Sequence, residues 1–374
     1  MALEFDRFSP AHVADPYPLY ERARHEAPVT YADAFGVWVV TRYDDVRTVL
    51  GDAERFSNDF LIRTPLVAAD GVREILAGGH PELKVLLNED PPDHGRSRAL
   101  VAAAFSPRRV RQLAPRIQAI ADELIDDIAA GPDTDLMAAY ALPLPLRVIC
   151  EMLGIPPADA DRVRAWTEEL KTLTSFDVTP ERQRAAAHGS VAFERYLAAL
   201  VEDRRAAPGD DLLSDLLTYE TPELVSLLLT LIFGGHETTA NLIGSALLRM
   251  LTRPGDVDTI IEETLRRDPP VQGSFRKVVH DTELSGVRIP AGAQVFAVIG
   301  SANHDAPAEP SLSFGRGIHY CVGAQLAKLE AHTALTTLAR RLPGLRLADG
   351  FEAPYVPNLM HRGLVRLDVV RTPA

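Results

Sequence analysis

The segment from Phe314 to Gly323, Phe-Gly-Arg-Gly-Ile-His-Tyr-Cys-Val-Gly, constrains this chain more than any other. It holds three glycines, one histidine and one cysteine within ten residues. Apolar residues recur at helical spacing directly after it, which predicts a helix that begins near Val322. Cys321 therefore lies where a loop enters a helix. The free N–H groups and the dipole at that end favour a thiolate over a thiol, and the glycines let the backbone approach a flat ligand closely.

A cysteine in this position is also compatible with three other roles. Most free cysteines are small buried hydrophobes. A zinc site needs further ligands nearby, and His319 is the one within reach. A disulfide would require Cys150, the other cysteine of the chain, which lies in an apolar run without a loop signal. On the residues alone, these alternatives stay open.

The order Phe-x-x-Gly-x-His-x-Cys-x-Gly resembles the haem-binding loop of the cytochrome P450 family. The resemblance implies that Cys321 is the axial thiolate ligand of the iron of haem b, with Phe314 beside the sulfur. A thiolate donates electron density that favours O–O cleavage. Gly315 and Gly323 belong to the same cofactor-binding loop. The resemblance also implies a mainly α-helical fold with small antiparallel sheets, in one domain of residues 1–374.

Four basic residues are implied as partners of the haem propionates. His94 and Arg98 are four residues apart and share one helical face. Such a pair by itself is more often a solvated basic face, but its position after Asp-Pro-Pro matches the family. By the same resemblance, Arg276 and His319 are the further propionate partners.

Residues Pro222 to Leu251 are mostly apolar and predict a long helix. Its centre, Gly234 to Thr239, holds two glycines, each of which costs about 1 kcal/mol in a helix, and two threonines whose hydroxyls can bind a backbone carbonyl. This composition predicts a local bulge. The centre also resembles the family's Gly-Gly-x-Glu-Thr-Thr, which implies that Thr238 lies beside bound dioxygen and that Glu237 supplies protons. Without that resemblance, the segment is a buried helix with a polar kink.

Glu263 and Arg266 precede Asp-Pro-Pro at helical i, i+3 spacing. The pair resembles the Glu-x-x-Arg of the family, and we expect it to be a buried structural ion pair. Compared with the family, the chain is short at residues 211–222, 252–259 and 305–313. The last of these holds no arginine to complete the Glu-x-x-Arg network.

Composition excludes several classes of protein. The net charge of −13 argues against nucleic acid as a partner. The N-terminus lacks the basic and apolar regions of a signal peptide, and the longest apolar run, Leu227 to Gly235, is too short to cross a membrane. Two cysteines without a pairing pattern suit a reducing compartment. We therefore expect a cytoplasmic protein without membrane contact, and the Ala-, Arg- and Asp-rich composition suggests a bacterium.

The function implied by the resemblance is monooxygenation, the insertion of one oxygen atom from dioxygen by hydroxylation or epoxidation. Electrons would come from a separate ferredoxin and its reductase, because no segment suggests a flavin, nicotinamide or iron–sulfur domain. We expect a monomer and a small lipophilic substrate. Its pocket would be lined by residues 57–90, 165–195, Val271 to Phe275 and Val356 to Met360. A peroxygenase that uses hydrogen peroxide and a non-catalytic haem-thiolate sensor are the alternatives, and Glu237-Thr238 argues against both.

Overall fold

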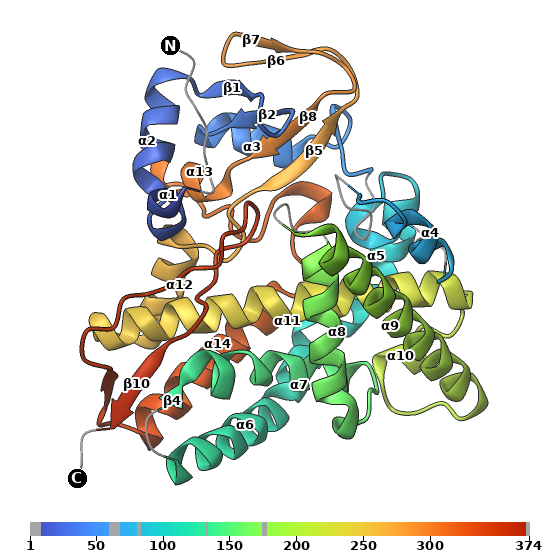
Figure 1. Cartoon of the computed structure of the whole chain (residues 1–374), viewed down its shortest axis with the longest axis vertical. Helices are drawn as coiled ribbons and strands as arrows, with labels where there is room; N and C mark the ends of the chain where they lie inside the picture. Colours follow the sequence, from blue (N-terminus) through green and yellow to red (C-terminus); the bar gives the residue numbers. More distant parts are fainter. Residues whose placement is uncertain (1–8, 60–67, 81–83, 132–133, 174–177, 372–374) are drawn as a thin grey trace. The chain divides into compact units, whose positions relative to one another are not determined.

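The computed structural model describes residues 9–59, 68–80, 84–131, 134–173 and 178–371 (Figure 1). Helices make up 59% of the structure, and the described strands have two to five residues each. The expected mainly α-helical fold with small sheets is confirmed. Parts of the expected pocket segment 57–90, namely residues 60–67 and 81–83, lie outside the described residues.

The chain forms two compact units, each assembled from segments that are distant in sequence. The first unit contains residues 1–58, 107–144 and 237–374, and the second contains residues 59–106 and 145–236. Each is described by itself below. The single domain expected from the sequence stays a prediction.

The first unit contains the glycine-rich segment, and helix α3 contacts it. Its helical elements are α1 (Pro10–Ala14), α2 (Tyr17–Glu26), α3 (Tyr43–Gly51), α6 (Pro107–Ala130), the π-helical turn η2 (Met137–Ala141), α12 (Val257–Arg267), α13 (Ile299–Asp305), the 3-10 turn η4 (Gly317–His319) and α14 (Ala324–Arg341). Its strands are β1 (Val29–Ala32), β2 (Val37–Val40), β3 (Phe56–Ser57), β4 (Thr134–Asp135), β5 (Ser274–Val278), β6 (Thr282–Leu284), β7 (Val287–Ile289), β8 (Gln294–Ala297), β9 (Leu345–Leu347) and β10 (Asp368–Arg371).

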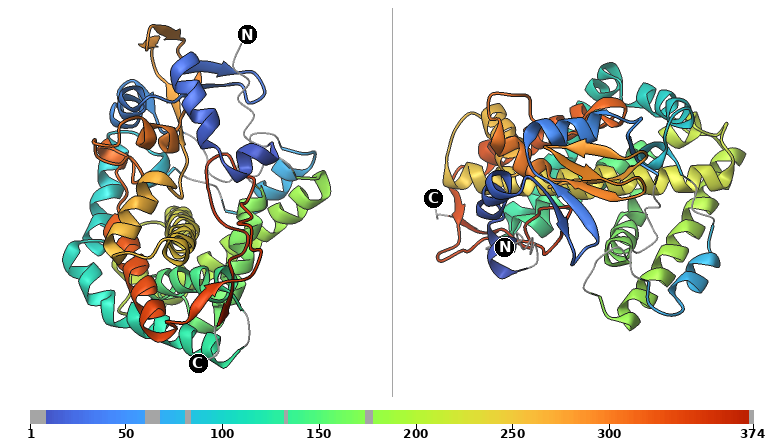
Figure 2. Two further views of the ribbon diagram at one scale, coloured as in Figure 1. Left: turned by 90° about the vertical axis from the view of Figure 1, so that its left-hand side faces the viewer. Right: turned by 90° about the horizontal axis from the view of Figure 1, so that it is seen from above.

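The largest sheet of the first unit has the strand order β1-β2-β8-β5-β3. The antiparallel hairpin of β1 and β2 pairs Val29 with Val40. In Figure 2 the blue hairpin lies beside the orange strands β5 and β8. Strands β2 and β8 run parallel, an exception to the expected antiparallel pairing, because the long chain between them leaves their directions free. The small sheets β4-β10-β9 and β6-β7 are antiparallel.

Helix α3 covers the large sheet and leads to the glycine-rich segment. Its apolar residues recur at i, i+3 and i+4, and Val46, Val49 and Leu50 are all buried. They belong to one core cluster with Phe56 and Val295 from the strands. This packing fixes the C-terminal end of α3, where Gly51 lies.

Helices make up most of the described residues of the second unit. It contains α4 (Val72–Ala77), the 3-10 turn η1 (Leu86–Asn88), α5 (Asp93–Ala104), the 3-10 turn η3 (Pro157–Asp159), α8 (Ala160–Leu173), α9 (Pro180–Ala206) and α10 (Leu212–Asp215). Helices α8 and α9 pack against each other, and Trp166 stacks on Phe193 at 5.2 Å between ring centroids.

Two helices, α7 (Pro143–Met152) and α11 (Thr221–Thr252), contain residues of both units. Helix α11 is α-helical without interruption, so the local bulge predicted at Gly234 to Thr239 was wrong. A Cβ atom at Gly235 would lie 3.3 Å from Cδ1 of Ile149. The glycine thus allows close packing against α7 and does not distort its own helix.

Candidate functional site

The glycine-rich segment forms a closed loop before α14. The backbone N–H of Gly315 donates to the carbonyl of Leu312 at 2.8 Å, and that of Cys321 donates to the carbonyl of Phe314 at 2.9 Å. Gly315 and Gly317 have φ angles of 71° and 70°, a left-handed conformation that side chains disfavour. The loop therefore has one backbone shape, set by its own hydrogen bonds and glycines.

Gly317 also lies against another element. A Cβ atom at this position would stand 3.0 Å from the carbonyl oxygen of Gly51 and 3.1 Å from its Cα atom. Since backbone cannot give way as a flexible side chain can, any larger residue would push the loop away from α3. Both the conformation and the contact require glycine here.

Cys321 is exposed, whereas Cys150 is buried. Burial, followed by the nearby charges of Glu151 and Asp159, raises the pKa of the Cys150 thiol to about 12. Cys150 is therefore a protonated core residue, and Cys321 is the thiol open to a ligand. Helix α14 begins at Ala324 with Gly323 as its N-cap, two residues later than the sequence predicts.

Two aromatic rings lie on the same loop. Phe314 and Tyr320 are 6.5 Å apart between centroids, with an interplanar angle of 56°. The ammonium group of Lys328, on the first turns of α14, lies 5.7 Å from the centroid of Phe314. The loop thus presents its thiol within an apolar and locally cationic surface.

Arg276 and His319 belong to the same unit as Cys321. Arg276, on β5, is buried, and its Nη1 atom donates to Oγ of Ser274 and to the carbonyl of Phe275, both at 2.7 Å. His319 is the last residue of the 3-10 turn η4, two residues before Cys321. A buried guanidinium and a loop imidazole are suitable donors to carboxylate groups.

His94 and Arg98 lie on α5, in the second unit. His94 is buried in the first turn of the helix, and Arg98 is half-buried one turn later. Burial, followed by the positive charge of Arg98, lowers the pKa of His94. The imidazole is consequently neutral near pH 7 in this arrangement. The predicted shared helical face is confirmed, while the propionate role stays a prediction.

Glu237 and Thr238 lie at the centre of α11, in its part that belongs to the first unit. Both side chains are half-buried, between the buried residues His236 and Thr239. His236 to Thr239 are thus four consecutive polar residues on this helix.

The expected buried pair between Glu263 and Arg266 was wrong. The Glu263 carboxylate is 49% exposed and pairs with Arg249 of α11 at 3.0 Å. Arg266 instead donates to the backbone carbonyl of Glu309 at 2.9 Å. Glu309 lies in the short stretch before the glycine-rich loop. Its backbone carbonyl therefore lies beside the Arg266 guanidinium, where the carboxylate of Glu263 was expected.

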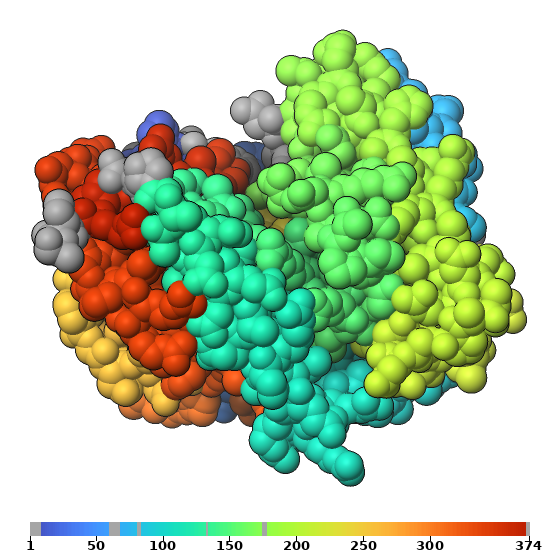
Figure 3. Space-filling view, turned by 90° about the horizontal axis from the view of Figure 1, so that it is seen from below, coloured from blue at the N-terminus to red at the C-terminus, as the bar shows by residue number. Residues whose placement is uncertain are grey.

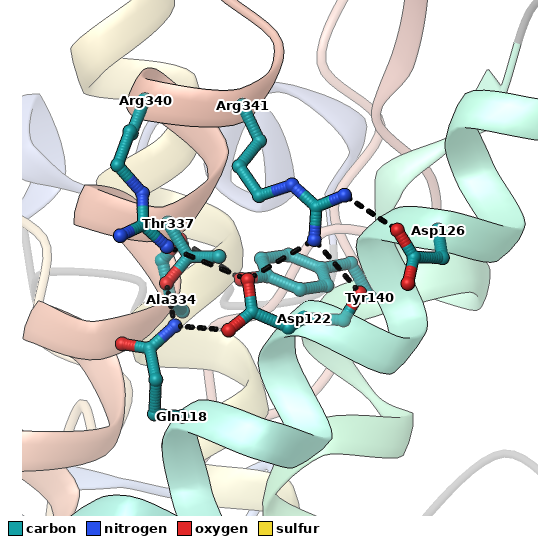
Figure 4. A network of polar contacts seen from close by, with 8 residues as sticks. All are labelled: Gln118, Asp122, Asp126, Tyr140, Ala334, Thr337, Arg340 and Arg341. Atoms are coloured by element: carbon teal, nitrogen blue, oxygen red, sulfur yellow. Dashed lines mark hydrogen bonds and ion pairs between the residues drawn. The ribbon is translucent and has the colours of Figure 1, made fainter.

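Helix α14, which follows Cys321, is held to α6 by a network that we call the Arg341 cluster: Gln118, Asp122, Asp126, Thr337, Arg340 and Arg341 (Figure 4). Arg341 donates to Asp122 at 3.1 Å and to Asp126 at 2.5 Å. Gln118 donates to Thr337 at 2.9 Å. In Figure 3 the teal surface of α6 borders the orange-red surface of the C-terminal region. The network anchors the helix behind the thiol.

A second arginine network was missed from the sequence. Arg362 is buried, and it connects Asp268 to the N-terminal helices of the first unit. A local signal existed, because a single arginine lies among the residues Asn358 to Leu364. The sequence does not reveal which carboxylate lies next to it.

The donor set fits the haem that the resemblance implies. A single exposed thiol can supply one axial ligand, and haem requires no further cysteine. Arg276 and His319, in the same unit as Cys321, suit the propionates of such a group. The basic side chains would hold the haem by its propionates, and the thiolate would hold it by its iron.

Comparisons with known proteins agree with this interpretation. The sequence model described as Cytochrome P450 matches residues 257–309. The chain is 36% identical to Cytochrome P450 107B1 of Saccharopolyspora erythraea, over 97% of this chain and 96% of the relative. It is 37% identical to the Vitamin D(3) 25-hydroxylase of Pseudonocardia autotrophica, over 99% and 97%. That alignment spans 405 residues, more than the 374 of this chain, so the relative has residues that this chain lacks.

The fold has solved counterparts as well. The structure of cytochrome P450 CREJ in complex with (4-ethylphenyl) dihydrogen phosphate superposes with a TM-score of 0.90. It is 30% identical, and the match covers 96% of this chain and 98% of the other. Among the described residues, no helix has both the length and the apolarity to span a membrane.

Proposed function

This chain belongs to the cytochrome P450 family and is a monooxygenase, and on that premise we propose that it inserts one oxygen atom from dioxygen into a lipophilic organic substrate. The observation that carries the proposal is the exposed Cys321 on a closed glycine loop. The family binds haem, which supplies the activation of dioxygen when bound.

We assign haem b as the form of the cofactor, and Cys321 is the residue whose thiolate would hold its iron. Phe314 shields the sulfur from water, and Gly315 and Gly323 let the loop approach the macrocycle. The propionates take the basic residues His94, Arg98, Arg276 and His319.

We assign Thr238 and Glu237 as the catalytic residues of the distal side. The Thr238 hydroxyl would hold a proton on the distal side, and the Glu237 carboxyl would resupply it from solvent. Both lie on a rigid, uninterrupted helix, which keeps the two groups in fixed order.

The substrate assignment is a lipophilic molecule. The relative named Vitamin D(3) 25-hydroxylase is so named for a lipophilic substrate. The segments Val271 to Phe275 and Val356 to Met360 are assigned as pocket walls. Val356 to Met360 contains mainly apolar side chains, and Val271 and Phe275 are the apolar side chains of the other segment; both sets suit such a ligand.

A separate ferredoxin with its reductase is the proposed source of electrons, and a monomer is the proposed state. The cytoplasmic location expected from the sequence stays a prediction.

The ligand assignment is tested by the spectrum of the reduced protein with carbon monoxide. The wild type should show the red-shifted Soret band of a haem-thiolate protein. Cys321→His should lose the band while retaining some haem, and Cys150→Ser is the matched control that should keep it. A Cys321→His variant with the band intact would remove Cys321 from the site.

The distal assignment is tested by measuring donor consumption and product together. Thr238→Ala should continue to consume electrons but release more of them as hydrogen peroxide, because proton delivery is misplaced. Glu237→Gln should slow the whole cycle. The neighbouring Thr239→Ala, on the buried side, is the control. If Thr238→Ala forms as much product per electron consumed as the wild type, and Glu237→Gln turns over normally, the peroxygenase alternative is favoured.

A further inference from the structure

The two proposed pocket segments are joined directly through their backbones. The N–H of Gln272 donates to the carbonyl of Met360 at 2.7 Å, and the N–H of Arg362 donates to the carbonyl of Pro270 at 2.8 Å. Between these bonds, Val271 and His361 form an antiparallel bridge. One segment therefore cannot shift along the other without breaking these bonds.

The first segment has its own anchor. The Gln272 side chain donates to the carbonyl of Pro269 at 2.9 Å and accepts from the Tyr20 hydroxyl at 3.1 Å. The Gln272 carbonyl accepts from the N–H of Gly300 at 3.0 Å. These contacts hold the segment to α2 and α13 independently of the second segment.

The second segment has Leu359 buried in the core, and Arg362 anchors the chain just after it. The guanidinium Nε atom donates to Asp268 at 2.5 Å, and Nη1 and Nη2 donate to the carbonyls of Val13 and Ala14, each at 2.9 Å. Its Cζ atom lies 3.5 Å from the ring centroid of Tyr355. One side chain thus connects the end of α12, the N-terminal helices and the residue before the second segment.

The guanidinium remains charged although it is buried. Burial disfavours its charge, but the attraction of Asp268, Tyr355 and Tyr17 outweighs this and raises the pKa of Arg362. Tyr17 adds a hydrogen bond to the same Asp268 oxygen at 2.7 Å. We call Tyr17, Asp268, Tyr355 and Arg362 the Arg362 cluster.

We propose that Arg362 is a positioning residue that determines substrate specificity by fixing the segment Val356 to Met360 against the segment Val271 to Phe275. Arg362 acts through the backbone of its neighbours and touches no reacting group. The proposal rests on the proposed function, because that function makes the two segments pocket walls.

Lysine is the informative replacement. It keeps a positive charge for Asp268, but a single ammonium group cannot reproduce the planar fork to both carbonyls or the stack on Tyr355. The matched control is Arg341→Lys, the same change in the same unit, at a cluster that contacts neither segment.

The first measurement needs neither haem nor substrate. In Arg362→Lys, hydrogen exchange at the backbone amides of positions 272 and 362 should be about tenfold faster, equivalent to ~1.4 kcal/mol. In Arg341→Lys these amides should exchange as in the wild type. Equal exchange in wild type and Arg362→Lys would overturn the proposal.

The second measurement uses a panel of lipophilic molecules, including steroids and vitamin D(3), titrated against the haem spectrum. In Arg362→Lys the ratio of Kd values between panel members should change by about tenfold, with the carbon monoxide band intact. A uniform change in all Kd values would show a merely structural role and overturn the proposal. If the wild type lacks the band, the proposed function fails, while the exchange result still decides whether Arg362 positions the segments.

If Arg362→Lys does not fold, Tyr355→Leu is the second variant, since it leaves the ion pair with Asp268 and both carbonyl bonds in place. The same altered Kd ratio is expected, to a smaller extent. An unchanged ratio in Tyr355→Leu would overturn the proposal.

Discussion

The Arg362 cluster and the Arg341 cluster each join segments that are distant in sequence, but they do so in different surroundings. Arg362 and Asp268 have side chains that are 8% and 18% exposed. Arg341 and its partners Asp122 and Asp126 are 32%, 34% and 66% exposed. Both arginines make short bonds to carboxylates, so geometry alone would rank them as equals.

The difference in burial separates the two clusters energetically. A solvated ion pair contributes about 0–1 kcal/mol, since water already stabilises both charges. Removing one partner of a buried pair costs about 3–5 kcal/mol, because the other charge stays without solvent. The Arg341 cluster therefore stabilises the fold through several weak bonds, whereas the stability that the Arg362 cluster supplies depends on each of its members.

The largest expected effect follows from removing the Asp268 charge. Asp268→Ala should lower the free energy of unfolding by about 3–5 kcal/mol, as measured by denaturant unfolding. The double variant Asp268→Ala/Arg362→Met should recover part of this loss, because no unpaired charge remains. A double variant as unstable as the sum of its single changes would break the comparison.

Glu330 adds a third case to the comparison of the two clusters, because it is a buried acid that pairs with no arginine among the described residues. It is 2% exposed on α14, and its Oε2 atom has no hydrogen-bond partner among the described residues. Burial raises its pKa well above the usual value. The unfolded state therefore releases the proton first, and stability falls as the pH rises from about 4.3, the usual carboxyl value.

Glu330→Gln should accordingly melt at a higher temperature than the wild type at pH 8, with the difference shrinking toward pH 4.5. Thermal melts across this range check the prediction. A constant difference between the two proteins at every pH would show that ionisation of Glu330 is irrelevant to folding.

The stack on Tyr355 should have a smaller effect. Tyr355→Leu removes the aromatic face beneath the guanidinium and should cost about 1–2 kcal/mol, as a desolvated cation–π contact does. Tyr355→Phe keeps the face and should stay near the wild type. Equal losses in the two variants would assign the effect to the hydroxyl.

The smallest effect is expected at the solvated cluster. Arg341→Met should cost less than any of the changes above, and less still in high salt. The hydrogen bond from Gln118, with those of Arg341, lowers the pKa of Asp122. Its stabilisation is thus present above about pH 4 and is lost as the pH falls through the lowered value. Asp122→Asn should lose this pH-dependent part of the stability. A loss of stability in Arg341→Met that does not change with salt would contradict a solvated ion pair.

What the sequence could predict was mostly local. The hydrogen bond from the N–H of Cys321 to the carbonyl of Phe314 joins residues that are close in sequence, so the local motif specifies it. The apolar period that follows the motif predicts the start of α14 to within two residues. The long helix around Glu237 and Thr238 was predicted from its apolar content, and the structure shows it uninterrupted.

Partner choice over long distances could not be predicted. Glu263 pairs with Arg249 of another helix, a contact that spacing along one helix does not reveal. Gly235 was interpreted as a source of distortion, whereas its neighbour Ile149 accounts for it through packing. Arg362 was missed for the same reason, since Asp268 lies 94 positions earlier in the chain.

The contact between Gly317 and Gly51 limits how this enzyme can be diversified. Because the two backbones nearly touch, a substitution at position 317 cannot be compensated by a change in one side chain. A mutational library that randomises the loop would lose nearly every variant altered there. Directed evolution toward new substrates should therefore keep Gly317 constant and vary the two pocket segments, which lie on other elements.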